Sequence, residues 1–348
     1  MAFLRVVFRL ILAVLVLAGI ALYWCYQGLH EQTTHDKAST YITIEQGSAV
    51  NRIITQLYNE GVLTSPASLK LYLRTLGKDI QLQAGDYQFP SPVSAMEVLA
   101  LLQDGRKRTK PLTLPEGWTR FEIAARIASQ FPGTPALAEA DVLALLDQTS
   151  LIAAFDPAAH NLEGYLYPTT YEIETEAQPR AVVERLVQEF ESVWQADWDA
   201  RAKELGRSRR EIVTIASLIE NESKLEGERP VVASVIYNRL KGGIPLGLDA
   251  TNVYIAKMLG RWDGTLHRSD LEVDHPYNTR KIQGLPPGPI CSPSKEALHA
   301  ALYPAETYYL YYVLNVDAND GSHNFYENSA GFARGKAKYQ RWLATQRN

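Results

Sequence analysis

The hydrophobic positions divide the chain into segments of different character, and the first is an apolar run near the N-terminus. Residues Leu10–Tyr26 include no charged side chain, whereas Arg5 and Arg9 come before them. A helix of this length covers about 25 Å, and the hydrocarbon core of a bilayer is about 30 Å thick. Val6–Phe8 extend the run and Arg9 can reach back to the interface, so the length is sufficient, and the run predicts a transmembrane anchor over residues 1–26.

The flanking residues predict how this anchor is oriented. Under the positive-inside rule Arg5 and Arg9 stay in the cytoplasm, and Trp24 suits the opposite membrane interface. The alternative is a cleaved signal peptide, but bulky residues such as Tyr23 and Tyr26 stand where a signal peptidase requires small side chains. We predict a single-pass protein of the inner (cytoplasmic) membrane, with the following domains in the periplasm or extracytoplasmic space.

A polar stretch and a small domain follow the anchor. Residues 27–40 are polar and lack periodicity, which predicts a flexible tether. Short alternating and helical patterns then predict an α/β domain over residues 41–108, which ends in the basic run 106–108, interpreted as a solvated linker. The elements expected in this domain are a strand at 41–44, helices beginning at 50 and 66, a strand within 84–89 and a helix around 96–102.

The second domain is predicted to run from residue 109 to 348. Long helical patterns occupy residues 180–205, 208–224, 230–241 and 330–346, and short alternating runs indicate strands at 308–314 and 324–326. No internal repeat is visible. The whole chain is therefore expected to belong to the α+β class, with helices dominating.

Composition and motifs narrow the possible functions. The net charge of −4 and a pI near 6.0 provide no basic field for nucleic-acid phosphates, so a nucleic-acid partner is not expected. Cys25 and Cys291 lie far apart and form no disulfide framework. The sequence has no Walker loop, no HExxH and no GxSxG, and its histidines are scattered. Neither a metal nor a cofactor is predicted.

One helical segment carries a carboxylate at the end of an apolar stripe. Ile212, Ile215 and Ile219 recur at helical spacing, and Glu222 continues the same face three residues after Ile219. Glu220 points about 160° away from Glu222, so only one of the two can face a given cleft. Glu222 is therefore the candidate acid.

A purely structural role for Glu222 remains open from this pattern alone. The carboxylate could close its helix in an ion pair with Lys224 or Arg229. The two interpretations differ in what surrounds the carboxylate: basic partners in one case, an apolar cleft in the other.

Several motifs occur in a fixed order around this segment. In residue type and order they resemble the YceG-like family of endolytic murein transglycosylases, and the resemblance covers nearly the whole chain. The chain departs from the usual family pattern at Thr169, Asn221, Gly247 and Ala250, which bears on subsite contacts more than on the acid. The matching motifs are Glu163–Pro168, Ala216–Glu222, Glu228-Arg229, Asn238–Leu240, Tyr277–Thr279, Gly284–Ile290, and His323 with Phe325.

The resemblance implies both a fold and an activity. It implies a LysM-like glycan-binding domain over residues 41–108 and a lysozyme-like, YceG-like catalytic domain over residues 109–348. The implied enzyme is an endolytic lytic transglycosylase. It cleaves the MurNAc-GlcNAc β-1,4 bond of nascent peptidoglycan strands, leaves 1,6-anhydro-MurNAc ends and terminates strand elongation. The implied partners are the glycan strands and a peptidoglycan polymerase.

The resemblance also assigns site residues. The family's catalytic glutamate maps onto Glu222. The substrate-binding candidates are Glu163, Glu220, Asn238, Asp249, Tyr277, Asn278 and His323.

A single carboxylate is chemically sufficient for such a reaction. Most glycosidases need two carboxylates, one as acid and one as nucleophile or base. Here the attacking group is the C6 hydroxyl of the muramoyl sugar itself, so one residue gives a proton to the leaving oxygen and then takes one from that hydroxyl. The first step requires a raised carboxyl pKa, which an apolar helix face supplies by desolvation.

Two other functions remain possible at this stage. The first is a hydrolytic muramidase in which Asp249 or Glu163 activates water, and the second is a glycan-binding scaffold without activity. Product mass separates hydrolysis from transglycosylation, because a hydrolytic product is heavier by one water. A scaffold is expected to lack the acid, and Glu222 is present.

Overall fold

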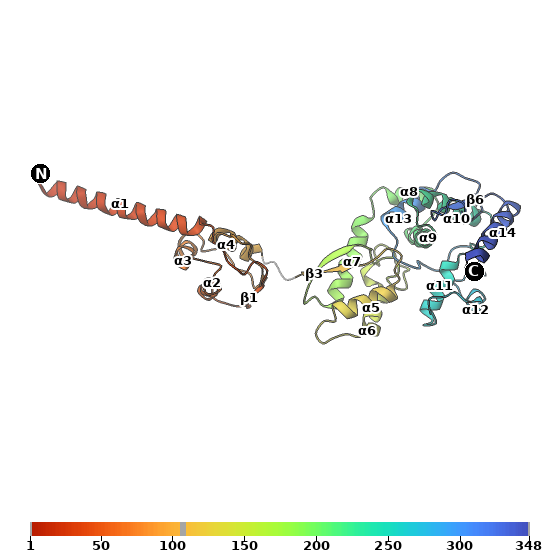
Figure 1. The fold of residues 1–348 in the computed structure, drawn as a ribbon, viewed down its shortest axis with the longest axis horizontal. Helices are drawn as coiled ribbons and strands as arrows, with labels where there is room; N and C mark the ends of the chain where they lie inside the picture. The colour runs from red at the N-terminus through yellow and green to blue at the C-terminus, as the bar shows by residue number, and fades with distance from the viewer. Residues whose placement is uncertain (1, 105–108, 347–348) are drawn as a thin grey trace. The chain divides into compact units, whose positions relative to one another are not determined.

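The computed structural model describes residues 2–104 and 109–346, and the chain forms two compact units, Met1–Lys110 and Pro111–Asn348 (Figure 1). Helices dominate, and the strands of the described residues form three separate two-stranded sheets. The predicted helix-dominated α+β class is therefore confirmed. The basic run 106–108, interpreted as a linker, lies outside the described residues.

The first helix, α1, runs over Ala2–His30. Its segment Arg9–His30 contains an 18-residue window with a mean hydropathy of 2.0 and is long and apolar enough to cross a membrane, so α1 is a candidate membrane anchor. Large apolar side chains of this segment are exposed, including Leu17 and Leu22. Such exposure suits contact with lipid better than contact with water.

The segment 27–40, expected as a flexible tether, is instead attached to the first unit. Its first residues continue α1, and Leu29 is only 7% exposed within the core of the unit. Thr33 and Val93 then pair as an isolated antiparallel bridge, with N···O distances of 2.8 and 3.0 Å. The prediction failed because polar composition does not reveal one buried leucine or backbone pairing to a distant residue.

The rest of the first unit has the expected order of strand, two helices, strand and helix. β1 and β2 pair antiparallel with Ile42 opposite Tyr87, and the helices bury leucines, isoleucines and valines against them. The elements are β1 (Ile42–Ile44), α2 (Val50–Asn59), α3 (Pro66–Thr75), β2 (Gly85–Tyr87) and α4 (Ala95–Asp104).

The second unit is built from helices around a shared core, with two small sheets. β3 pairs with β4, and β5 pairs antiparallel with β6. The strands are β3 (Thr109–Thr113), β4 (Thr170–Glu174), β5 (Tyr311–Leu314) and β6 (His323–Tyr326). The helices are α5 (Arg120–Gln130), α6 (Glu139–Leu146), η1 (Thr149–Leu151), α7 (Pro179–Val193), α8 (Trp198–Glu204), α9 (Arg209–Glu222), η2 (Glu226–Glu228), α10 (Arg229–Lys241), α11 (Asp249–Met258), α12 (Arg268–Leu271), α13 (Lys295–Leu302) and α14 (Ser329–Gln346).

The single helix predicted over residues 180–205 is wrong, because the structure divides it into α7 and α8. Trp194 ends α7 with an extended ψ of 114°. Its ring then meets that of Trp198 edge to face at 5.3 Å, and its Nε1 donates to Asp199 at 3.1 Å. Packing of the half-buried Trp194 on the buried Trp198 outweighs one more helical turn, and periodicity alone does not reveal this packing.

Helix α9 is the central element of the second unit. All residues from Ile212 to Ile219 are buried, and the helix packs against α8, α10, α11 and α13 (Figure 1). Ser208 caps its N-terminus in a capping box with Glu211. A helix fixed on all sides holds its last residue, Glu222, in a defined position.

We expect Trp198→Ala to destabilise the second unit by about 3–5 kcal/mol, because a large side chain that is 1% exposed would leave a cavity. Thermal or chemical unfolding of the purified protein measures the change. Tyr308→Ala, at a side chain that is 84% exposed, is the control and should change stability by no more than about 0.5 kcal/mol. Equal effects of the two substitutions would contradict the described packing of α8.

Candidate active site

Glu222 ends α9 at a small pocket on the second unit. Its Oε2 accepts a hydrogen bond from the Tyr312 hydroxyl at 2.7 Å. The pocket has a volume of about 160 Å³. Apart from Glu222 and Tyr312, it is lined by Val235, Ile236, Arg239, Leu246, Gly247, Leu248, Asp249 and Phe332. The candidate acid therefore faces a cleft with mainly apolar walls.

These surroundings raise the pKa of the Glu222 carboxyl. Burial is the main cause, and the nearby negative charge of Asp249 acts in the same direction. The hydrogen bond from Tyr312 lowers the pKa and so opposes the shift, as do the charges of His323 and Arg280. The net effect keeps a proton on the carboxyl at higher pH than usual, as a general acid requires.

The ion pair considered as an alternative role for Glu222 does not form. Lys224 is exposed, and Arg229 pairs with Glu220 at 3.0 Å. Within residues 2–104 and 109–346, Glu222 takes part in no ion pair.

Asp249 is the second carboxylate of the pocket. It begins α11 and forms an ion pair with Arg280, whose side chain comes from the loop after α12. Asn278 shapes that loop, since its side-chain amide donates to the carbonyls of Leu271 at 3.1 Å and Val273 at 2.7 Å. Asn278 is fully buried and acts on the pocket through the loop that carries Arg280.

Glu220 lies on the opposite face of α9, as its spacing from Glu222 predicts. Its carboxylate pairs with Arg229 and accepts hydrogen bonds from the backbone and side chain of Ser294, the N-cap of α13. Both side chains of the ion pair are 6% exposed. Glu220 therefore joins α9 to α10 and α13 in the interior, away from the residues that line the pocket.

Glu163 is buried and Tyr277 is half-buried, and neither lines the pocket of Glu222. Both carboxylate oxygens of Glu163 accept from the backbone N–H of Arg120 at 3.1 Å. Burial raises the pKa of Glu163 to about 7 and that of Tyr277 to about 12. The Tyr277 ring packs on Tyr254 at 5.1 Å.

His323 and Asn238 hold the backbone on which Tyr312 lies. His323, at the start of β6, donates its backbone N–H to Glu228 at 2.7 Å and bonds the same carboxylate through Nδ1 at 2.8 Å. Its ring meets that of Tyr312 edge to face at 5.3 Å. Asn238 donates to the carbonyl oxygens of Thr307 and Tyr309 at 2.9 and 3.0 Å, just before β5.

Sequence reasoning missed three residues of the site: Tyr312 and Arg239, which line the pocket, and Arg280, which pairs with Asp249. Tyr312 lay inside a predicted strand with nothing to mark it, and Arg280 follows the Tyr277–Thr279 motif without belonging to it. Arg239 stood in the Asn238–Leu240 motif, which was the available signal. Its guanidinium donates to the carbonyls of Leu246 and Leu310, both at 2.6 Å, so it fixes two walls of the pocket.

Comparison with known proteins decides the family. A profile of the YceG-like family matches residues 42–338. The chain belongs to the YceG-like family. Among its YceG-like relatives, the endolytic murein transglycosylase of Bacillus subtilis is 30% identical, over 86% of this chain and 85% of that protein. That of Streptococcus pneumoniae is 28% identical over 86% of this chain, which corresponds to 58% of the longer relative.

A solved structure supports the same membership. The crystal structure of a yceG-like protein from Listeria monocytogenes superposes with a TM-score of 0.57 and 32% identity. It covers 84% of this chain and 98% of the Listeria chain. The YceG-like fold therefore extends over most of both proteins.

One departure from the usual YceG-like pattern lies in the pocket itself. Gly247 lines it with a φ of +64°, and a Cβ there would lie 3.7 Å from the Arg239 guanidinium. At this position the chain thus offers no side chain to the pocket. Among the described residues, no cluster of His, Cys, Asp and Glu is arranged to hold a metal ion.

We expect Glu222→Gln to stabilise the protein at neutral pH. Because the folded-state pKa is raised, the unfolded chain loses its Glu222 proton first, and ionisation then favours unfolding. The stability gain should vanish well below pH 4.5, where the carboxyl is protonated in both states, and grow as the pH rises above 4.5 until the folded-state pKa is passed.

Unfolding measured from acidic to alkaline pH tests this expectation. Glu220→Gln is the matched control two residues away, and it should lower stability at neutral pH because Arg229 would lose its buried partner. A Glu222→Gln variant that is less stable than the parent at neutral pH would contradict the raised pKa.

Proposed function

We propose that this protein is an endolytic lytic transglycosylase that cleaves the glycan strands of peptidoglycan with Glu222 as its single acid and base. The carrying observation is that Glu222 combines a raised pKa, a hydroxyl donor in Tyr312 and a position in a cleft. The names of the Bacillus and Streptococcus relatives supply the reaction class.

The proposed reaction consists of two proton transfers at one residue. Protonated Glu222 donates to the glycosidic oxygen, and the bond from C1 of the MurNAc residue to that oxygen breaks. The resulting carboxylate then takes the proton of the C6 hydroxyl, whose oxygen closes on C1 to form the 1,6-anhydro ring. No water enters, and Glu222 ends in its starting protonation state.

The surroundings of Glu222 suit both steps. Burial favours the protonated carboxyl at the start, and the Tyr312 hydroxyl stabilises the carboxylate that forms in between. The positive charge of Arg280 acts on the same intermediate state. The acetamido group of the substrate would support the developing charge at C1, in the manner of substrate-assisted glycosidases.

Substrate binding is proposed to involve the surface around this pocket. Of the predicted substrate-binding residues, Asp249 is the one that lines the pocket, so it is the best candidate for direct contact with the glycan. Five of the other candidates make contacts within the protein and are proposed to position the cleft walls: Tyr277, Asn278, Asn238, Glu163 and Glu220. His323 is proposed to position Tyr312.

The first unit is proposed to be a LysM-like domain that binds glycan. Its order of strand, two helices and antiparallel strand supports this assignment. With α1 as a single-pass anchor in the inner membrane, the rest of the first unit and the second unit would lie outside the cytoplasm, near nascent strands and a peptidoglycan polymerase. Cleavage there would end strand elongation.

A hydrolytic muramidase is the second candidate, because Asp249 lines the same pocket and offers a carboxylate that could activate water. Glu163, also considered for this role, does not line the pocket.

Products of an early digest of long, uncrosslinked strands distinguish the candidates. We expect mid-length fragments ending in 1,6-anhydro-MurNAc, identified by mass spectrometry. Products heavier by one water would show a hydrolase, and digests dominated from the outset by anhydro-disaccharides would contradict endolytic cleavage. Glu222→Gln should lower turnover by at least about 100-fold, because glutamine cannot transfer a proton. Wild-type turnover in that variant would show that the acid is another residue.

The proposed topology makes a separate prediction. A reporter enzyme that is active only outside the cytoplasm, fused to the C-terminus, should be active in cells, because Arg5 and Arg9 favour a cytoplasmic N-terminus. The matched control is a reporter that is active only in the cytoplasm, fused at the same position. If the cytoplasmic reporter were active and the extracytoplasmic reporter inactive, the proposed topology would be contradicted.

A further inference from the structure

Helix α3 of the first unit presents two large apolar side chains outward. Leu69 and Leu73 fill the core, whereas Leu71 is 52% and Leu76 is 83% exposed. A single exposed leucine is ordinary on a protein surface. Two exposed leucines on one short helix and its C-cap, next to the apolar helix α1, require an explanation of what covers them.

Both side chains lie beside α1. Helices α1 and α3 are in contact, two grooves of about 730 and 810 Å³ are lined by residues of both helices, and Leu71 lines both grooves. Trp24 lines the first groove, while Tyr26 and Leu76 line the second. The exposed leucines are therefore level with the last turns of the candidate membrane span, Arg9–His30.

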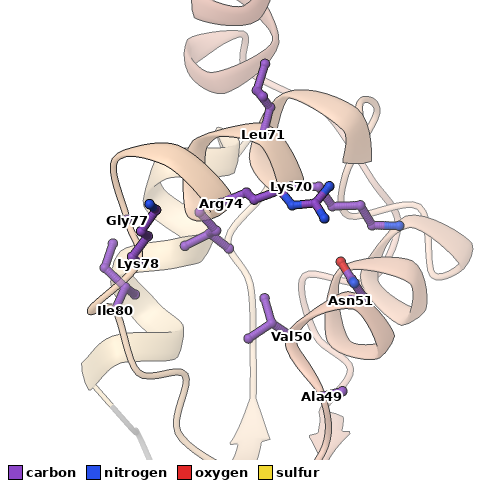
Figure 2. Close-up of a pocket in the computed structure, with 10 residues that line it drawn as sticks. Ala49, Val50, Asn51, Lys70, Leu71, Arg74, Gly77, Lys78 and Ile80 are labelled. Carbon is purple, nitrogen blue, oxygen red and sulfur yellow. The ribbon is translucent and has the colours of Figure 1, made fainter.

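A third groove, of about 750 Å³, lies next to the same leucine and is basic (Figure 2). Lys70, Arg74 and Lys78 line it, and its lining contains no acidic residue. Figure 2 shows Leu71 pointing away from Val50 at the opposite end of the groove, while Lys70 and Arg74 extend between them. Apolar and basic side chains thus stand next to each other along α3.

We propose that the first unit docks on an anionic phospholipid bilayer through α3. Leu71 and Leu76 enter the boundary between headgroups and acyl chains, and Lys70, Arg74 and Lys78 contact lipid phosphates. The proposal rests on the membrane anchoring by α1 proposed above, and it adds a second contact on the folded unit itself.

Three physical arguments favour lipid over another occupant. Tryptophan and tyrosine concentrate at membrane interfaces, and Trp24 and Tyr26 fix that level on α1, beside the two leucines. Helices with apolar and basic faces side by side bind at interfaces, with the apolar face buried about 5–10 Å into the boundary. Basic residues near an anionic surface add electrostatic attraction. The sugar rings of a glycan strand would not use the two exposed leucines.

Spin labels on the full chain in vesicles test the proposal. Cys25 is replaced by serine, Cys291 is buried and remains unlabelled, and single labels are placed at Leu76→Cys, at Leu15→Cys in α1 and at Tyr58→Cys in α2. In vesicles containing phosphatidylglycerol, the label at Leu76 should collide several-fold more often with oxygen than with a water-soluble nickel chelate. The label at Tyr58 should show the reverse.

The three labels separate the possible failures. A lipid-buried label at Leu15 with a water-exposed label at Leu76 would overturn the docking and leave the anchor intact, whereas water exposure at both would overturn the anchor. Protection of the Leu76 label from both reagents would indicate a protein partner or a second copy and would also overturn the proposal.

The basic groove is tested by charge reversal. Combining Lys70→Glu, Arg74→Glu and Lys78→Glu, or replacing phosphatidylglycerol by phosphatidylcholine, should shift the Leu76 label several-fold toward the nickel chelate. Folding of the variants is checked by circular dichroism and by the label at Tyr58→Cys, because all three substituted residues lie in the same unit as α2. An unchanged label after both treatments would overturn the proposed phosphate contacts.

Discussion

The spacing of two residues between Glu220 and Glu222 is the constraint on which the site depends. Two residues turn a helix by about 200°, so these carboxylates must face opposite sides of α9. One enters the interior, where it meets Arg229 and Ser294, and the other faces the pocket. The buried ion pair fixes the rotation of α9 about its axis and thereby the direction of the second carboxylate.

The two glutamates also connect α9 to different later parts of the chain. Glu220 contacts the start of α10 and the N-cap of α13, where a negative charge is favourable beside free backbone N–H groups. Glu222 meets Tyr312 on β5, which is 90 residues away in sequence. A carboxylate and its hydroxyl donor therefore come together only when the second unit is completely folded.

The parts of the fold that follow from local periodicity could be predicted. The apolar stripe of Ile212, Ile215 and Ile219 predicted helix α9, and the helical spacing predicted that Glu220 and Glu222 point in opposite directions. Contacts distant in sequence could not be predicted. Tyr312, the pairing of Thr33 with Val93 and the bend between α7 and α8 are all determined by tertiary packing.

The candidate site was predicted only in part, because the contacts of its side chains are distant in sequence. Glu222 and Asp249 do line one pocket. Asn238 and Asn278 resemble ligand-binding amides in sequence, yet their amides donate to backbone carbonyls of adjoining loops. A buried amide must satisfy its own donors, so an asparagine in a loop motif is a common way to fix the loop. Sequence identifies such a residue without distinguishing these two uses.

The buried thiol of Cys291 has a consequence for chemical durability. Its sulfur lies 2.9 Å from the amide nitrogen of Asn221 and 3.3 Å from the carbonyl oxygen of Ser217, and burial raises its pKa well above the usual value. Oxidants attack the thiolate form and need access to the sulfur. Here the raised pKa keeps the thiol protonated, and burial keeps oxidants away from the sulfur. In the oxidising compartment proposed for this enzyme, a cysteine next to the helix of the proposed acid Glu222 can thus remain reduced without a disulfide partner.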